Sequence, residues 1–182
     1  MGHPPDHAPD RAPNLVSAAD KTLLIVYHSM TGGAHQMAQA ACDGAQGEPG
    51  VRVRLRHASD VAPDEVLAAD GYIFATPENL AAISGQLKDF FDRCYYPVLD
   101  RISGRPYASL ICAGSDGSNA ARQIARIAMG WRLKPVAEPL IMCTHAQTPE
   151  AIAAPKQIDE ESLTACRALG EALAVGLVLG VF

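Results

Sequence analysis

The sequence has few cysteines, and none of them forms a Cys-x-x-Cys pair. The five cysteines are scattered along 182 residues and are odd in number. A disulfide scaffold or a structural zinc site needs closer and more regular spacing, so the pattern argues against both. We therefore expect a reducing, cytoplasmic environment and no metal site.

Long apolar runs are also missing. No run approaches the roughly 18 residues that a membrane-spanning helix requires. The first residues hold prolines instead of the apolar stretch of a secretory signal. We expect residues 1–20 to be a disordered N-terminal lead, residues 21–182 to form a single domain, and no membrane contact.

The chain lacks a strong charge of either sign. It carries 15 basic and 20 acidic residues, for a formal net charge of -5. A nucleic-acid surface is typically basic, so this balance argues against a nucleic-acid partner and says little about small ligands.

Two familiar nucleotide-binding motifs are absent. A Walker loop ends in Gly-Lys-Ser/Thr, yet no lysine lies between Lys21 and Lys88, and no Gly-x-Gly-x-x-Gly fingerprint is present. What the chain has is a stretch over residues 27–35, rich in glycine and hydroxyls, between an apolar run (23–26) and a helical pattern (36–42).

A strand, a tight loop and a helix in this order are typical of a phosphate cradle, because the first N–H groups of a helix favour an anion. Ser29 and Thr31 supply hydroxyls, and Gly32 and Gly33 allow a close approach of the backbone. Without a lysine or arginine in the loop, the pattern favours a terminal monophosphate. The alternative is a plain turn capped by Ser or Thr.

Apolar strands and amphipathic helices alternate along the rest of the chain. Such alternation predicts an α/β fold, a doubly wound five-stranded parallel sheet of strand order 2-1-3-4-5 with helices on both faces. Ligands of such sheets bind beyond the carboxyl ends of the strands, where the order reverses. The predicted strands are 21–27, 51–56, 72–75, 107–112 and 136–143, and the predicted helices are 34–45, 63–69, 85–95, 119–131 and 156–179.

Several local features have two interpretations each. The arginines of strand 51–56 suit a solvated edge strand or a basic ligand face, and Phe90 and Phe91 suit core packing. Asp116 is a helix cap or a ligand contact. Trp131, Tyr95 and Tyr96 either pack or supply an aromatic to a ligand, and His28, His35 and His145 are surface or capping histidines or proton donors.

One run carries a family resemblance. Residues 84–93, Ser-Gly-Gln-Leu-Lys-Asp-Phe-Phe-Asp-Arg, follow Thr76-Pro77, and Ser29-Met30-Thr31-Gly32 stands earlier in the chain. Together these resemble the flavodoxin superfamily, above all the tryptophan-repressor-binding-like NAD(P)H:quinone reductases and the NADPH-dependent FMN reductases. The resemblance covers about residues 22–143.

The resemblance implies a flavodoxin-like fold that holds FMN non-covalently, with NAD(P)H as co-substrate and the flavin carrying the chemistry in place of catalytic side chains. By the family pattern, the first loop wraps the phosphate, the second lines one side of the flavin ring and the third faces its pyrimidine end. The residues carried over are Ser29, Met30, Thr31, Gly32, Gly33 and Ala34; Thr76, Pro77, Glu78, Asn79, Leu80 and Ala81; and Cys112, Ala113, Gly114, Ser115 and Asp116.

Three functions remain open at this point. The first is an enzyme that passes a hydride from NAD(P)H through FMN to a quinone or another small acceptor. The second is a flavodoxin-type electron carrier, although carriers lean on a more acidic docking face. The third is a non-catalytic relative, since Leu80 and Ala82 stand where the family often has an aromatic and an asparagine. The apolar C-terminal end, from Val175 to Phe182, further predicts a homo-oligomer, most simply a dimer.

Overall fold

The computed structural model describes residues 21–182, and the predicted N-terminal lead lies outside these described residues. The strands form one sheet of order β2-β1-β3-β5-β6, with β4 paired to β3 and β7 paired to β5. The strands are β1 (Lys21–Tyr27), β2 (Val51–His57), β3 (Gly71–Asn79), β4 (Ala82–Ile83), β5 (Pro106–Ala113), β6 (Lys134–Pro135) and β7 (Leu140–Cys143). The α-helices are α1 (Gly33–Gln46), α2 (Pro63–Ala68), α3 (Gly85–Val98), α4 (Ser118–Gly130), α5 (Pro149–Ala153) and α6 (Glu160–Leu179), with a 3₁₀ turn over Ala58–Asp60.

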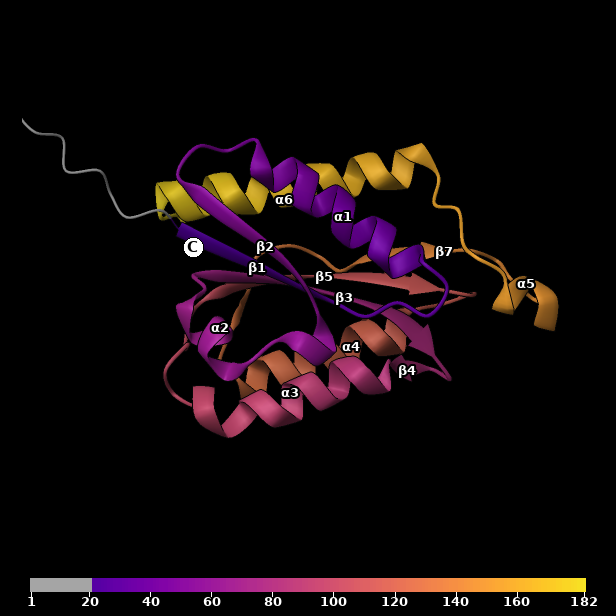
Figure 1. The fold of residues 1–182 in the computed structure, drawn as a ribbon, viewed down its shortest axis with the longest axis horizontal. Coiled ribbons are helices and arrows are strands. Elements are labelled where there is room, and N and C mark those ends of the chain that lie inside the picture. Colours follow the sequence, from indigo (N-terminus) through magenta and orange to yellow (C-terminus); the bar gives the residue numbers. More distant parts are fainter. Residues whose placement is uncertain (1–20) are drawn as a thin grey trace, which may run out of the picture.

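The sheet lies between two layers of helices (Figure 1). Helices α1 and α6 cover one face, and α2, α3 and α4 cover the other. Successive residues of β1 and β3 therefore point into two different cores, and the stretches Leu23–Val26 and Gly71–Thr76 are buried throughout. This explains their continuous apolar runs, which are typical of parallel strands covered on both faces.

The predicted architecture is confirmed. Strands β2, β1, β3 and β5 are parallel and follow the predicted order, with β6 and β7 both paired parallel to β5 in the fifth position. The predicted fifth strand is divided in two, however. Pro135 and Pro139 have no N–H to donate to β5, and the ladder is interrupted between Lys134–Pro135 and Leu140–Cys143.

The predicted last helix, 156–179, is wrong at its start. Helix α6 begins at Glu160, where the Asp159 side chain caps it by accepting a hydrogen bond from the N–H of Ser162 at 2.8 Å. Residues 156–159 are not helical, and a short helix that was not predicted, α5, lies before them. Its signals were readable in the sequence, since Thr148 caps it and Pro149 stands at its first turn.

Helix α6 is more apolar than predicted from the sequence. By length and composition alone it would suffice to cross a membrane, with a mean hydropathy of 1.5, although only a third of that window is buried. Arg167 and Glu171 interrupt the apolar residues of α6, so the helix contains no long uncharged run. Its buried residues pack against α1, which gives the apolar composition a structural reason. The predicted absence of membrane contact stays a prediction.

The two alternatives at the sheet edge and in α3 are resolved. β2 is an edge strand with exposed arginines, two of which pair with Glu65, so the basic row is a solvated edge. Phe90 and Phe91 are buried and contact Trp131, which is 3% exposed. Trp131 is therefore a core residue and not a ligand-stacking aromatic.

Candidate functional site at the carboxyl edge of the sheet

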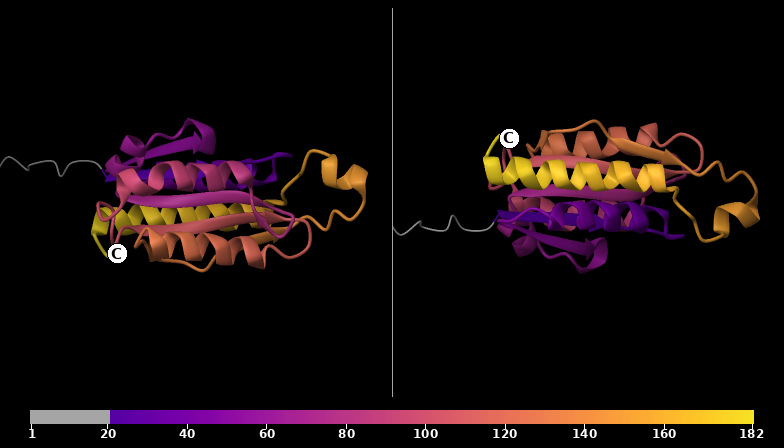
Figure 2. Two further views of the ribbon diagram at one scale, coloured as in Figure 1. Left: turned by 90° about the horizontal axis from the view of Figure 1, so that it is seen from below. Right: turned by 90° about the horizontal axis from the view of Figure 1, so that it is seen from above.

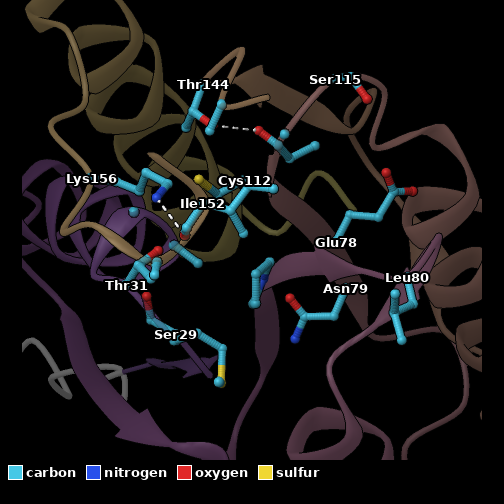
Figure 3. Close-up of a pocket in the computed structure, with 18 of the residues that line it drawn as sticks. Ser29, Thr31, Glu78, Asn79, Leu80, Cys112, Ser115, Thr144, Ile152 and Lys156 are labelled. Atoms are coloured by element: carbon cyan, nitrogen blue, oxygen red, sulfur yellow. Dashed lines mark hydrogen bonds between the residues drawn. The ribbon is translucent and has the colours of Figure 1, made fainter. Parts of the chain in front are cut away.

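A cavity of about 680 Å³ opens at the carboxyl ends of β1, β3 and β5. The loops after these three strands supply most of its wall, and the segment around α5 supplies the rest (Figure 3). Small-molecule sites usually have volumes of about 300–1,000 Å³, so the cavity is of ligand size. Its lining residues are Ser29, Met30, Thr31, Gly33, Ala34, Pro77, Glu78, Asn79, Leu80, Ala81, Cys112, Ala113, Gly114, Ser115, Thr144, Ala146, Gln147, Ile152, Ala153 and Lys156.

The structure brings all but three of the predicted site residues together around this cavity. The exceptions are Gly32, Thr76 and Asp116. Thr76 is fully buried, and its hydroxyl donates to the carbonyl of Pro77 (2.9 Å) and accepts from the N–H of Ser84 (3.1 Å). Thr76 thus fixes the start of α3 and does not face the cavity. Gly32 precedes α1 and donates its N–H to the hydroxyl of Ser29 at 3.0 Å.

The first loop presents the amino end of α1 to the cavity. The N–H groups of Gly33, Ala34 and His35 have no acceptor within the helix, and the first turn of α1 contains no acidic residue. A Cβ atom at Gly33 would clash with the Sγ of Cys112, so a larger residue there would have to displace that thiol. The loop can therefore approach a ligand with its backbone, and its end of the cavity favours an anion.

The second loop is a β-hairpin. Strand β3 continues to Asn79, four residues beyond the predicted end, and pairs antiparallel with β4. Leu80 and Ala81 form the two-residue turn, both with positive φ (49° and 59°), and Leu80 is fully exposed at the cavity. Non-glycine residues in the left-handed backbone region are strained, and such strain is found disproportionately at binding sites.

The third loop is connected to the second by Glu78. The carboxylate of Glu78 accepts hydrogen bonds from the N–H groups of Gly117 (2.7 Å) and Ala120 (3.2 Å) at the amino end of α4. Asp116 does not cap that helix, because its carboxylate accepts from the hydroxyl of Ser118 instead. The predicted capping role of Asp116 is therefore wrong. Asp116 is not among the residues that line the cavity, and its contact with a ligand stays a prediction.

The fourth wall was not predicted from the sequence. Residues 144–158, here called the arch, leave β7, form α5 beyond the end of the sheet and return to α6 (Figure 2). Two backbone hydrogen bonds hold its ends. The N–H of Thr144 donates to the carbonyl of Ala113 at 2.9 Å, and the N–H of Lys156 donates to the carbonyl of Thr31 at 2.8 Å. The arch residues were missed because their contacts with the three loops are long-range.

Few titratable groups line the cavity. Burial raises the pKa of the Cys112 thiol to about 11, partly offset by the nearby charge of Lys156, so the thiol stays neutral at physiological pH. Among the described residues, no histidine lines the cavity: His35 stacks on Tyr27 and His145 lies outside the lining. Tyr95 and Tyr96 also lie outside it, so the alternative of an aromatic supplied by them is wrong.

Comparison with known proteins agrees with this architecture. The family model described as NADPH-dependent FMN reductase matches residues 60–148, which include the second and third loops. A flavodoxin of Aquifex aeolicus is 30% identical over 95 residues, covering 52% of this chain and 51% of the relative. An NAD(P)H dehydrogenase (quinone) of Acidithiobacillus ferrooxidans is 33% identical over 91 residues, covering 39% of this chain and 46% of the relative. The matches span about half the length of these curated relatives.

Solved structures match over more of the chain. A flavodoxin from the domain Archaea superposes with a TM-score of 0.70 at 19% identity, covering 86% of this chain and 99% of that one. A WrbA-like flavodoxin from Agrobacterium tumefaciens superposes with a TM-score of 0.68 at 18% sequence identity, covering 88% of this chain and 99% of that one. At this identity the likeness shows the fold. Taken with the sequence matches and the sheet order, it shows that the chain has a flavodoxin-like α/β fold.

Proposed function

We propose that the chain binds FMN in the cavity at the carboxyl edge and passes a hydride from NAD(P)H through it to a quinone or another small acceptor. The observation that carries this proposal is the convergence of three sheet-edge loops on one cavity with an anion-favouring end. The activities in the relatives' names support the same reaction class.

The first loop fits a phosphate. Three helix N–H groups without intrahelical acceptors face the same end as the hydroxyls of Ser29 and Thr31. The hydroxyl of Ser29 accepts from Gly32 and keeps its own proton for donation. Because the sequence has no pyrophosphate-binding fingerprint, the first loop favours a single phosphate, and so FMN over FAD.

The other two loops fit a flat, largely apolar ring. Pro77, Asn79 and Leu80 come from β3 and its hairpin, and Ala113 and Gly114 come from the end of β5. Met30, Leu80 and Ile152 are exposed apolar side chains on three different segments around the cavity. Isolated exposed apolar side chains need no explanation, but three of them around one cavity suit an apolar ligand face.

The cofactor would supply hydride and electron transfer, and the chain's own residues would bind and orient it. The neutral Cys112 thiol and the absence of a histidine from the lining leave the described residues without an acid–base or nucleophilic pair at the cavity. This fits a site in which the protein positions a cofactor.

A flavodoxin-type electron carrier is the second candidate. The exposed apolar side chains of Met30, Leu80 and Ile152 would equally suit a protein partner docking over the cavity. Steady-state NAD(P)H oxidation, measured with and without a quinone, separates the two functions. The enzyme oxidises NAD(P)H and accelerates with quinone, whereas a carrier shows no turnover on its own.

Direct FMN titration of the purified protein tests the proposal, and a colourless protein that FMN does not bind would support a non-catalytic relative instead. Thr31→Ala should weaken the binding of FMN by about 1–2 kcal/mol, the range for losing a hydrogen bond to a charged group. Unchanged FMN affinity in Thr31→Ala would remove the first loop from the phosphate site.

A further inference from the structure

The backbone of Lys156 lies directly against the first loop. Its N–H donates to the carbonyl of Thr31 at 2.8 Å, and its carbonyl accepts from the Nε2 of Gln36 at 2.7 Å. The same Gln36 side chain accepts from the N–H of Ile158 at 3.2 Å, so both ends of the amide hold the arch. A Cβ atom at Gly33 would lie 3.4 Å from the Cβ of Lys156. Lys156 is thus fixed beside the amino end of α1.

The Nζ of Lys156 keeps an uncompensated positive charge. It donates to the carbonyls of Ala151 (2.7 Å), Ile152 (2.9 Å) and Ala154 (2.6 Å), at the carboxyl end of α5. These acceptors are neutral, and Lys156 takes no part in the ion pairs found among residues 21–182. The hydrogen bonds orient the ammonium group without cancelling its charge.

The cavity is therefore polarised. Among its described lining residues, Lys156 is the cationic side chain and Glu78 the anionic one, and the two lie on opposite sides (Figure 3). The positive side coincides with the amino end of α1 and the hydroxyl of Thr31. Low-dielectric walls strengthen such a field relative to open water, so an anionic ligand group is drawn to the Lys156 side.

We propose that Lys156 is a specificity-determining residue that makes the cavity prefer a phosphorylated flavin to its phosphate-free counterpart. The inference rests on the proposed function and deepens it. It also revises the expectation of a phosphate site without lysine or arginine: the cation comes from the arch, more than 120 residues along the chain from the first loop.

The test compares the binding of FMN and riboflavin to the full chain by calorimetry. Lys156→Met keeps most of the aliphatic side chain and removes the charge. We expect it to weaken the binding of FMN by on the order of tenfold and that of riboflavin by less than about twofold, since the positive charge attracts the phosphate, which riboflavin lacks. Lys156→Arg should retain most of the preference for FMN.

Lys134→Met is the matched control, because Lys134 is exposed in β6 at the amino edge of the sheet and its loss changes the net charge equally. It should leave both affinities unchanged. Equal weakening of FMN and riboflavin in Lys156→Met, or an unchanged ratio, would overturn the inference while leaving the proposed function intact. A parent protein that binds neither flavin would overturn the proposed function, and this inference with it.

Discussion

Glu78 and Gly117 join two loops that lie almost forty residues apart in the sequence. The carboxylate of Glu78, at the end of β3, accepts a hydrogen bond of 2.7 Å from the N–H of Gly117, directly before α4. Its other oxygen accepts from Ala120 at 3.2 Å. A residue carried over as a flavin contact is thus also the cap of a helix, and it holds the second and third loops together at the cavity.

Replacing Glu78 should destabilise the fold because the amino end of α4 loses its acceptor. We expect Glu78→Ala to lower the free energy of unfolding by about 1–2 kcal/mol, as measured by urea denaturation. Asp116→Ala is the control, since the Asp116 carboxylate accepts from the hydroxyl of Ser118 and from no backbone N–H of α4, and this variant should cost less than about 0.5 kcal/mol. A larger loss from Asp116→Ala than from Glu78→Ala would reverse this assignment of the cap.

Helices α1 and α6 approach backbone to backbone at Gly44 and Gly170. A Cβ atom at Gly170 would lie 1.9 Å from the carbonyl oxygen of Ala41, and one at Gly44 would lie 2.1 Å from that of Arg167. Gly170→Ala must therefore push the helices apart, and we expect a loss of about 1–3 kcal/mol in the free energy of unfolding.

Gly130→Ala provides the matched comparison, because a Cβ atom there meets nothing within 4 Å. Alanine at this helical position should be neutral or slightly stabilising. Chemical denaturation of the two variants beside the parent checks both expectations. A Gly170→Ala protein as stable as the parent would show that the two helices are not in close contact.

His28 makes stability depend on pH. It is 5% exposed, and its Nδ1 has no hydrogen-bond partner among the described residues. Burial, with a smaller contribution from His57, lowers the pKa of His28 below its usual 6.5. The unfolded chain therefore binds a proton more readily, and stability should fall as the pH drops below about 6.5 until the folded-state pKa is passed.

The variant His28→Leu removes this titration and should flatten the stability profile between neutral and mildly acidic pH. Thermal melting over that range measures the difference between variant and parent. His145→Asn, at an exposed loop position with positive φ, should keep the parent's slope. If parent and His28→Leu lose stability in parallel, protonation of His28 is not the cause.

Gly114 tests the placement of the third loop. It lines the cavity, its φ is not positive, and an added Cβ would meet only the carbonyl oxygen of Ala146, at 3.7 Å. We expect Gly114→Val to keep the fold but to block the cavity, abolishing FMN binding and flavin-dependent NAD(P)H oxidation. Ser115→Ala should do much less. FMN titration and thermal melting distinguish the variants, and normal FMN binding by Gly114→Val would remove the third loop from the flavin site.

The sheet and the three loops could be predicted from the sequence because each depends on residues that are adjacent in the chain. The apolar run at 23–26 and the glycines of the first loop are enough to place a strand, a turn and a helix start. The role of Glu78 and the position of Lys156 depend on partners 39 and 125 residues away, to which no local pattern points. The orientation of Thr76 has a related cause: its strand continues past the predicted end, and its hydroxyl accepts from the N–H of Ser84.

Side-by-side titration of the purified protein with FMN and FAD tests the central claim, that this cavity is an FMN site, most directly. The account predicts saturable FMN binding, seen as a change in the visible flavin spectrum and as heat in a calorimeter, with FAD bound more weakly. FAD bound more tightly than FMN, or an FMN titration without any spectral or thermal change, would contradict it.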